Sequence, residues 1–270
     1  MYHVCRSRSR LCDHHRARLG LIHLFSFELS HSQLALFALV GLLIGMAKVG
    51  ISGTGMIAVP ILAIIFGGRN SSGIMLPILI MADVFGTTYY RKHTQWDHLK
   101  KLLPPAVIGV IIGTFVGEKI PDETFKLIMG VVIFLSIGIL LVLEFSKREW
   151  VPKGVSFAIV IGILLGFTTM VGNLAGSVMA LYLLANNMPK NKYIGTVAWF
   201  FISINIFKVP FHIFWWKTID LNTFLLDLTL LPLVAIGAYL GIKIVKQMNE
   251  KVYRYFIIVM TIVAAFFMIL

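Results

Sequence analysis

Two charged side chains lie within apolar stretches of the first half of this chain. Lys48 closes an otherwise uncharged run, and Asp83 has apolar neighbours on both sides. A charge held within a membrane is costly, and it usually faces a cavity or a partner of opposite sign. A Lys48–Asp83 pair would neutralise both charges, and it could also open and close with a substrate or a proton. The structural alternative for Lys48 is a lysine near a helix end whose ammonium extends to the interface.

A matching polar patch lies in the second half of the chain. Lys208 and His212 stand on either side of Pro210, and Asn205 precedes them by one helical turn. The ammonium of Lys208 could attract an anion, and the imidazole of His212 could carry a proton near neutral pH. The alternative for both is a position at a water interface, which is the favoured reading for His212.

Two glycine-rich breaks interrupt the apolar runs, at residues 50–55 and 172–177. Irregular backbone at membrane depth is tolerated only where protein or a water-filled cavity satisfies its polar groups. A helix that restarts at such a break directs free N–H groups and its positive dipole end into the cavity, which attracts anions. The predicted binding residues at the breaks are Ser52, Gly53, Thr54 and Gly55 in the first half and Asn173, Gly176 and Ser177 in the second. The alternative is that these glycines only allow close helix packing.

The composition is that of a membrane protein built from helices. The 270 residues are 58% hydrophobic and only 13% charged, whereas a soluble domain carries about 25% charged residues. The apolar runs are continuous and about 20 residues long, which suits membrane-spanning helices and not alternating barrel strands. The net charge of +12 comes mainly from the tail and the connections. We therefore expect contact with anionic lipid headgroups, and no nucleic-acid binding.

The two halves of the chain repeat each other. The glycine pair Gly41 and Gly45 reappears as Gly162 and Gly166, about 121 residues later. A duplicated helical bundle with glycine interruptions is typical of a transporter whose site lies where the halves meet. The predicted fold class is all-α: a polytopic bundle of about eight spans, four per half, with a broken or re-entrant first element in each. Whether 56–66 and 177–184 are re-entrant or spanning is left open.

The predicted organisation has four parts. A basic tail covers 1–33, the first repeat 34–145, a linker 146–154 and the second repeat 155–270.

Ser30 and Ser32 are candidate N-caps of the first apolar helix. The basic loop around Arg91 and Lys101 places both termini in the cytoplasm. The glycine spacings 109–113–117 and 237–241 predict close helix contacts.

Enzymatic functions find little support in the sequence. The chain has no H-E-x-x-H pattern, no P-loop and no G-x-S-x-G motif. We therefore expect no enzymatic activity, no cofactor and no metal site, and we expect an ion gradient or the substrate gradient to supply the energy.

From about Leu34 to Leu270 the chain resembles the sulfite exporter TauE/SafE family. The resemblance rests on the first glycine break followed by Val59-Pro60-Ile61-Leu62, the basic connection after the second span, the third-span glycines and the repeat of the whole unit. It implies a multi-pass protein of the inner or plasma membrane that moves sulfite, sulfoacetate or other sulfur-containing anions outward. The family has a denser glycine run at the first break, and Leu181 replaces the second-half counterpart of Pro60.

The sequence thus predicts a secondary transporter of a small anion, exported with ion or proton coupling, and embedded in the lipid bilayer. Lys48, Lys208 and the two breaks would bind the anion, and Asp83 or His212 would couple a proton. The alternatives are an anion channel or a membrane scaffold without turnover, and, ranked last, cation import with Asp83 as a ligand. The oligomeric state is left open, with a homo-oligomer as one alternative.

Overall fold

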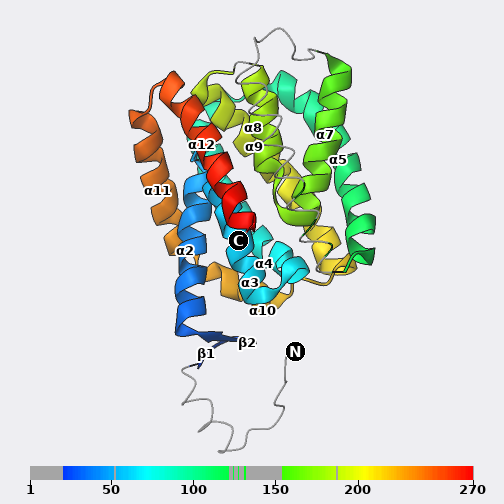
Figure 1. The fold of residues 1–270 in the computed structure, drawn as a ribbon, viewed down its shortest axis with the longest axis vertical. Coiled ribbons are helices and arrows are strands. Elements are labelled where there is room, and N and C mark those ends of the chain that lie inside the picture. Colours follow the sequence, from blue (N-terminus) through cyan, green and yellow to red (C-terminus); the bar gives the residue numbers. More distant parts are fainter. Residues whose placement is uncertain are drawn as a thin grey trace, which may run out of the picture.

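The computed structural model describes residues 21–51, 53–121, 154–186 and 188–269, together with 124, 127 and 131 (Figure 1). The elements in chain order are β1 (Leu21–Leu24), β2 (Phe27–Ser30), α2 (His31–Lys48), α3 (Thr54–Phe66), α4 (Gly68–Tyr90), the 3₁₀ helix η1 (Arg91–His93), α5 (Trp96–Lys119), α7 (Val155–Gly172), α8 (Ala175–Ala185), α9 (Lys190–Pro210), the π-helix η3 (Phe211–Trp215), α10 (Leu221–Leu228), α11 (Leu231–Gln247) and α12 (Glu250–Ile269). The predicted fourth span, at about 124–145, lies almost entirely outside the described residues.

A β-hairpin precedes the helical bundle. Strands β1 and β2 pair antiparallel, with Leu21 opposite Ser30. Ser30 then caps α2: its hydroxyl accepts from the Gln33 N–H, and the Gln33 side chain accepts from the Ser30 N–H. This reciprocal capping box confirms Ser30 as the N-cap. Residues 21–30 of the predicted basic tail 1–33 thus form a hairpin that leads into the first helix.

The first glycine-rich break lets the chain reverse between α2 and α3. Gly50 and Gly53 have φ angles of +118° and +101°, a region that residues with a Cβ rarely adopt. The hydroxyl of Thr54 donates to the carbonyls of Leu43 and Ile51 at 3.0 and 2.9 Å. The Thr54 hydroxyl therefore satisfies one backbone carbonyl of α2 and one of the break.

The helices that follow the two breaks each carry the chain back to the end where the preceding helix began. The ring of Phe66 at the end of α3 lies 5.8 Å from the ring of Phe37, which is early in α2. In the same way, the ring of Tyr182 in α8 lies 6.0 Å from that of Phe157 at the start of α7. Both short pieces are thus complete return limbs. Each broken first element thus contributes two antiparallel helices, and the number of membrane crossings, expected as four per half, stays a prediction.

Several helices are long and apolar enough to cross a membrane. Among the described residues there are five such helices, or six if the bent pair α10–α11, with an angle of 48°, forms one span. Large apolar side chains such as Val160, Phe214 and Tyr239 are exposed on the outside of the bundle. The protein is therefore an all-α polytopic membrane bundle, as the composition predicted.

Helices from opposite halves of the chain pack together through glycines. Gly41 of α2 lies against Leu230, and Gly241 of α11 lies against Val49. Because residue numbers rise together on both helices, α2 and α11 run parallel, and Figure 1 shows them side by side at one edge of the bundle. The close helix contacts predicted for Gly237 and Gly241 are confirmed.

The helix pair α5–α7 repeats this arrangement at the opposite edge of the bundle (Figure 1). Gly162 of α7 meets Pro105, and Gly113 of α5 meets Met170, so these two helices also run parallel. A Cβ at Gly166 would lie 1.8 Å from the carbonyl oxygen of Ala106. The backbones touch here, and only glycine fits.

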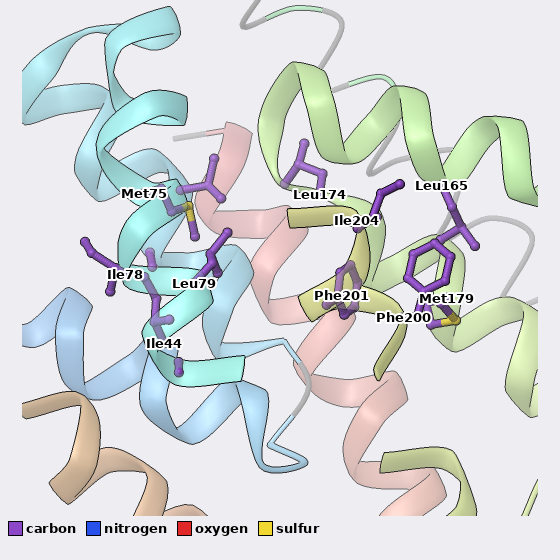
Figure 2. Close-up of a cluster of buried hydrophobic side chains, with 14 of the residues drawn as sticks. Ile44, Met75, Ile78, Leu79, Leu165, Leu174, Met179, Phe200, Phe201 and Ile204 are labelled. Atoms are coloured by element: carbon purple, nitrogen blue, oxygen red, sulfur yellow. The ribbon is translucent and has the colours of Figure 1, made fainter. Parts of the chain in front are cut away.

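The helices α4 and α9 cross antiparallel at the centre of the bundle. Gly73, early in α4, packs against Thr218 beyond the end of α9, and Gly195, early in α9, packs against Tyr90 at the end of α4. Figure 2 shows the apolar side chains around this crossing, with Met75 and Leu79 on α4 and Phe201 on α9. The crossing holds the polar side chains described next in the interior of the molecule.

Candidate functional site

Lys48 and Asp83 form an ion pair in the interior of the bundle. Their Nζ and Oδ1 atoms are 2.9 Å apart, and the side chains are 10% and 0% exposed. The ammonium also lies 4.2 Å from the centre of the Phe201 ring, an arrangement that stabilises a cation. Oδ1 of Asp83 has no well-aligned hydrogen bond among the described residues. The contact is therefore mainly a charge interaction, and it is the pairing that the sequence suggested.

Asn205 links this ion pair to the second half of the chain. Its Nδ2 donates to Oδ2 of Asp83 at 2.7 Å, and both side chains are fully buried. Its Oδ1 lies 3.4 Å from Nζ of Lys208. One amide thus joins the acid of α4 to the lysine of α9 at the point where these helices cross.

Lys208 is fully buried among neutral oxygen atoms. Its ammonium donates to the carbonyl of Thr169 at 2.7 Å and to Oδ1 of Asn173 at 2.6 Å, and the Thr169 hydroxyl lies at 3.2 Å. In the part of the chain that the structure describes, no carboxylate lies within ion-pair distance of Lys208. A buried charge without a counter-charge is rare in proteins and costly in a membrane.

A cavity of about 70 Å³ lies beside these charges. A buried water needs about 10–15 Å³, so the cavity has room for an anion of a few non-hydrogen atoms. Its polar lining comes from side chains on α2, α7, α9 and the second break: Lys48, Thr169, Asn173, Tyr193 and Asn205. Its apolar wall includes Met75, Leu79, Val197 and Phe201.

Both glycine-rich breaks open onto this one cavity. Gly53 and Gly55 line it from the first break, and Asn173 and Gly176 line it from the second. At the first break, α3 begins at Thr54 without a side-chain cap among the described residues. The first amides of a helix have no intrahelical partner, so this helix start can offer N–H donors to a bound anion.

The second break is shaped by Asn173. This residue is left-handed, with φ of +56°, and ends α7. Its Nδ2 donates to the carbonyl and the hydroxyl of Ser72 on α4, while its Oδ1 accepts from Lys208. Beside it, a Cβ at Gly176 would meet nothing within 4 Å. The break therefore leaves open space beside Asn173, a hydrogen-bond partner of Lys208. Lys208 itself is fully buried and does not line the cavity.

The remaining predicted site residues have different surroundings. The Thr54 hydroxyl is engaged with the backbone of its own turn, so it stabilises the break. His212 is buried beside Trp216, and its Nδ1 lies 2.8 Å from the Thr218 hydroxyl. It does not line the cavity. Ser52 and the side chain of Ser177 lie outside the described residues.

Thr169 and Asn205 line the cavity, but neither was predicted as a binding residue from the sequence. Asn205 lies 122 positions after Asp83, and Thr169 lies about 121 positions after Lys48. These separations match the offset between the repeats, so each residue occupies the position in the second half that a charged residue occupies in the first. The repeat register could have identified both. Asp227 on α10 was also overlooked: it is fully buried, and neither carboxyl oxygen has a hydrogen-bond partner among the described residues.

Comparison with known proteins gives a single clear family assignment. The family model described as sulfite exporter TauE/SafE matches residues 37–268. No curated protein matches the chain, and no solved structure does. The match covers nearly the whole chain, including both breaks and both buried lysines. This is a family of membrane transporters, which agrees with the apolar helices of the bundle and with a multi-pass location in the cell membrane. The chain belongs to the sulfite exporter TauE/SafE family.

Proposed function

We propose that this protein is a secondary transporter of a small anion, namely sulfite, an organosulfonate or a related sulfur-containing anion, and that it exports this anion with ion or proton coupling. The observation that carries the proposal is the buried ammonium of Lys208, which has only neutral oxygen partners beside a cavity. An anion in the cavity would supply the missing counter-charge.

The two breaks provide the rest of the binding site in this proposal. Helix starts at Gly53–Gly55 and at Ala175–Gly176 offer N–H donors and positive dipole ends to the anion. Lys48 lines the cavity itself, whereas Lys208 lies behind Thr169 and Asn173, which line it, so that both ammonium groups would attract the anion by charge. Movement of one repeat against the other would open the site to each side of the membrane in turn.

Proton coupling belongs to Asp83 or His212 in this mechanism. Asp83 is the stronger candidate because it directly contacts Lys48 and Asn205, and both of these line the cavity. A proton on Asp83 would release Lys48 toward a bound anion, and loss of that proton would restore the ion pair. His212 lies outside the cavity, so it would act on the site only through Lys208.

Counterflow in proteoliposomes tests the proposal. Labelled sulfite should exchange against an internal pool of unlabelled sulfite in the wild type. Lys208→Met keeps the length of the side chain and removes its charge. Because a hydrogen bond to a charged group contributes about 1.5–3 kcal/mol, we expect the exchange rate to fall at least about tenfold. Lys192→Met, an exposed lysine on the same helix, is the matched control and should keep the wild-type rate.

Two results would reject the proposal. Undiminished exchange by Lys208→Met would remove this lysine from the binding site. Absence of exchange by the wild type, with or without electrically detected anion flow, would favour the channel or scaffold alternatives.

A further inference from the structure

The buried charges around the cavity leave one positive charge unpaired. Lys48 and Asp83 cancel each other as an ion pair. Lys208 is held by Thr169 and Asn173 through neutral oxygens. The arrangement therefore has two ammonium groups but one carboxylate.

The hydrogen bonds of Lys208 fit the protonated form of its side chain. The Thr169 carbonyl and Oδ1 of Asn173 can only accept hydrogen bonds, so Nζ must donate to each of them. The orientation of the Asn173 amide is fixed, because its Nδ2 donates to Ser72. The third N–H faces the Thr169 hydroxyl and Oδ1 of Asn205, at 3.2 and 3.4 Å. Three donors facing acceptors fit an ammonium ion.

The other titratable groups near the site add no charge. His212 lies beyond Lys208 on η3, and its Nε2 is buried without an acceptor among the described residues, which fits a neutral imidazole that donates only from Nδ1. Tyr193 lines the cavity, and a phenol is neutral at physiological pH. Asp227 on α10 does not line the cavity. The charge at the binding site is thus set by Lys48, Asp83 and Lys208.

We propose that this charge count selects monoanions over dianions. The inference rests on the proposed function and narrows its substrate class to hydrogen sulfite and singly charged sulfonates. A monoanion leaves the buried site neutral. A dianion such as sulfate leaves one negative charge unpaired inside the bundle, where an unpaired charge is strongly disfavoured.

The shape of the cavity supports the same selection. Its side chains Lys48, Asn205, Thr169 and Asn173 are connected to one another through Asp83 and Lys208. Met75, Leu79 and Val197 contribute apolar surface without hydrogen-bond donors. All four oxygens of sulfate need hydrogen-bond partners. A sulfonate turns three oxygens toward the donors and its carbon toward the apolar wall. Asp83 is accordingly the specificity-determining residue, since it sets how many positive charges remain.

The test compares methanesulfonate with sulfate, two tetrahedral anions of similar size that differ by one charge. Their affinities for the purified full-length protein are measured by isothermal titration calorimetry. The wild type should bind methanesulfonate at least about tenfold more tightly than sulfate. Asp83→Asn leaves two unpaired lysines, and the preference should reverse toward sulfate.

Two further variants separate the charge count from the loss of individual contacts. Lys48→Met leaves Asp83 to cancel Lys208, and it should lose methanesulfonate binding by at least about tenfold. The double variant Lys48→Met with Asp83→Asn again has one unpaired lysine, so it should regain methanesulfonate binding and the preference of the wild type. This double variant also decides the question if Asp83→Asn alone does not fold.

The outcomes distinguish this inference from the proposed function. Equal affinity of the wild type for both anions, an unchanged preference in Asp83→Asn, or no recovery in the double variant would overturn the charge rule while leaving anion transport intact. Failure of the wild type to bind either anion would contradict both proposals.

Discussion

At the scale of single residues, Asn205 joins the parts of the site. It donates to Asp83 and accepts from Lys208, so it holds the acid of one repeat and the lysine of the other in register. It stands in the second repeat where Asp83 stands in the first. One position thus carries an acid in one half and the neutral amide in the other, and this asymmetry produces the unpaired positive charge.

Replacing Asn205 with Leu should destabilise the protein. The change removes the donor to Oδ2 of Asp83, and an unsatisfied buried polar group costs about 1–3 kcal/mol. We expect a lower melting temperature in detergent. Ser203→Ala is the matched control on the same helix, because the Ser203 hydroxyl bonds only to its own helix, at the Trp199 carbonyl. Equal melting temperatures for the two variants would contradict a bridging role for Asn205.

The sequence predicted the pairing of Lys48 with Asp83 but not the role of Asn205. The cost of burying a charge is a local argument, and it identifies Lys48 and Asp83 from their apolar neighbours alone. The contact of Asn205 with Asp83 depends on the antiparallel crossing of α4 and α9, which adjacent residues do not encode. Thr54 was assigned to binding because of its hydroxyl, yet a hydroxyl at a break can equally satisfy the backbone, and in the structure it does so. The binding roles of all the predicted residues, Thr54 included, remain predictions.

At the scale of elements, glycines determine which helices can touch. Gly45 faces the carbonyl of Val234 on α11, and Gly166 faces the carbonyl of Ala106 on α5. Each contact joins the first helix of one half to a helix of the other half. The glycine spacing predicted close packing, but it did not identify the partners, because any helix with a small-residue face would satisfy the pattern.

Replacing Gly166 with Ala should weaken the α5–α7 contact. The added methyl would lie 1.8 Å from the Ala106 carbonyl oxygen, so the helices must separate. Overpacking of this kind costs about 1–3 kcal/mol, and we expect a lower melting temperature. Gly154→Ala is the matched control, since its Cβ would meet nothing within 4 Å. A Gly166→Ala variant as stable as Gly154→Ala would show that the two helices do not pack as described.

The return limbs α3 and α8 were the least predictable elements. Each is shorter than a membrane crossing usually requires, so apolar length alone left their course open. The ring contacts Phe37–Phe66 and Phe157–Tyr182 show that α3 and α8 run back along the helices that precede them. Each contact joins two helices of the same half. The residues that make it lie far from the glycine-rich breaks, and the breaks were the only feature from which the sequence predicted a change of direction.

At the scale of the whole molecule, the two halves have opposite orientations. The equivalent helices α4 and α9 are antiparallel, while α2 pairs with α11 and α5 pairs with α7 in parallel. We infer an inverted repeat whose halves are interlocked, with the site at the crossing of α4 and α9. This arrangement suits alternating access, because each half can provide the opening to one side of the membrane. The sequence predicts the internal repeat, and the contacts between α4 and α9 support its inversion.

The most direct test of the account is to locate a bound anion. Selenite has the shape and charges of sulfite, and its selenium can be found by anomalous diffraction from crystals of the protein soaked with it. An anion bound as proposed gives a selenium peak in the cavity, beside Lys48 and next to both glycine-rich breaks. A peak elsewhere, or an empty cavity in a protein that exchanges sulfite in proteoliposomes, would contradict it.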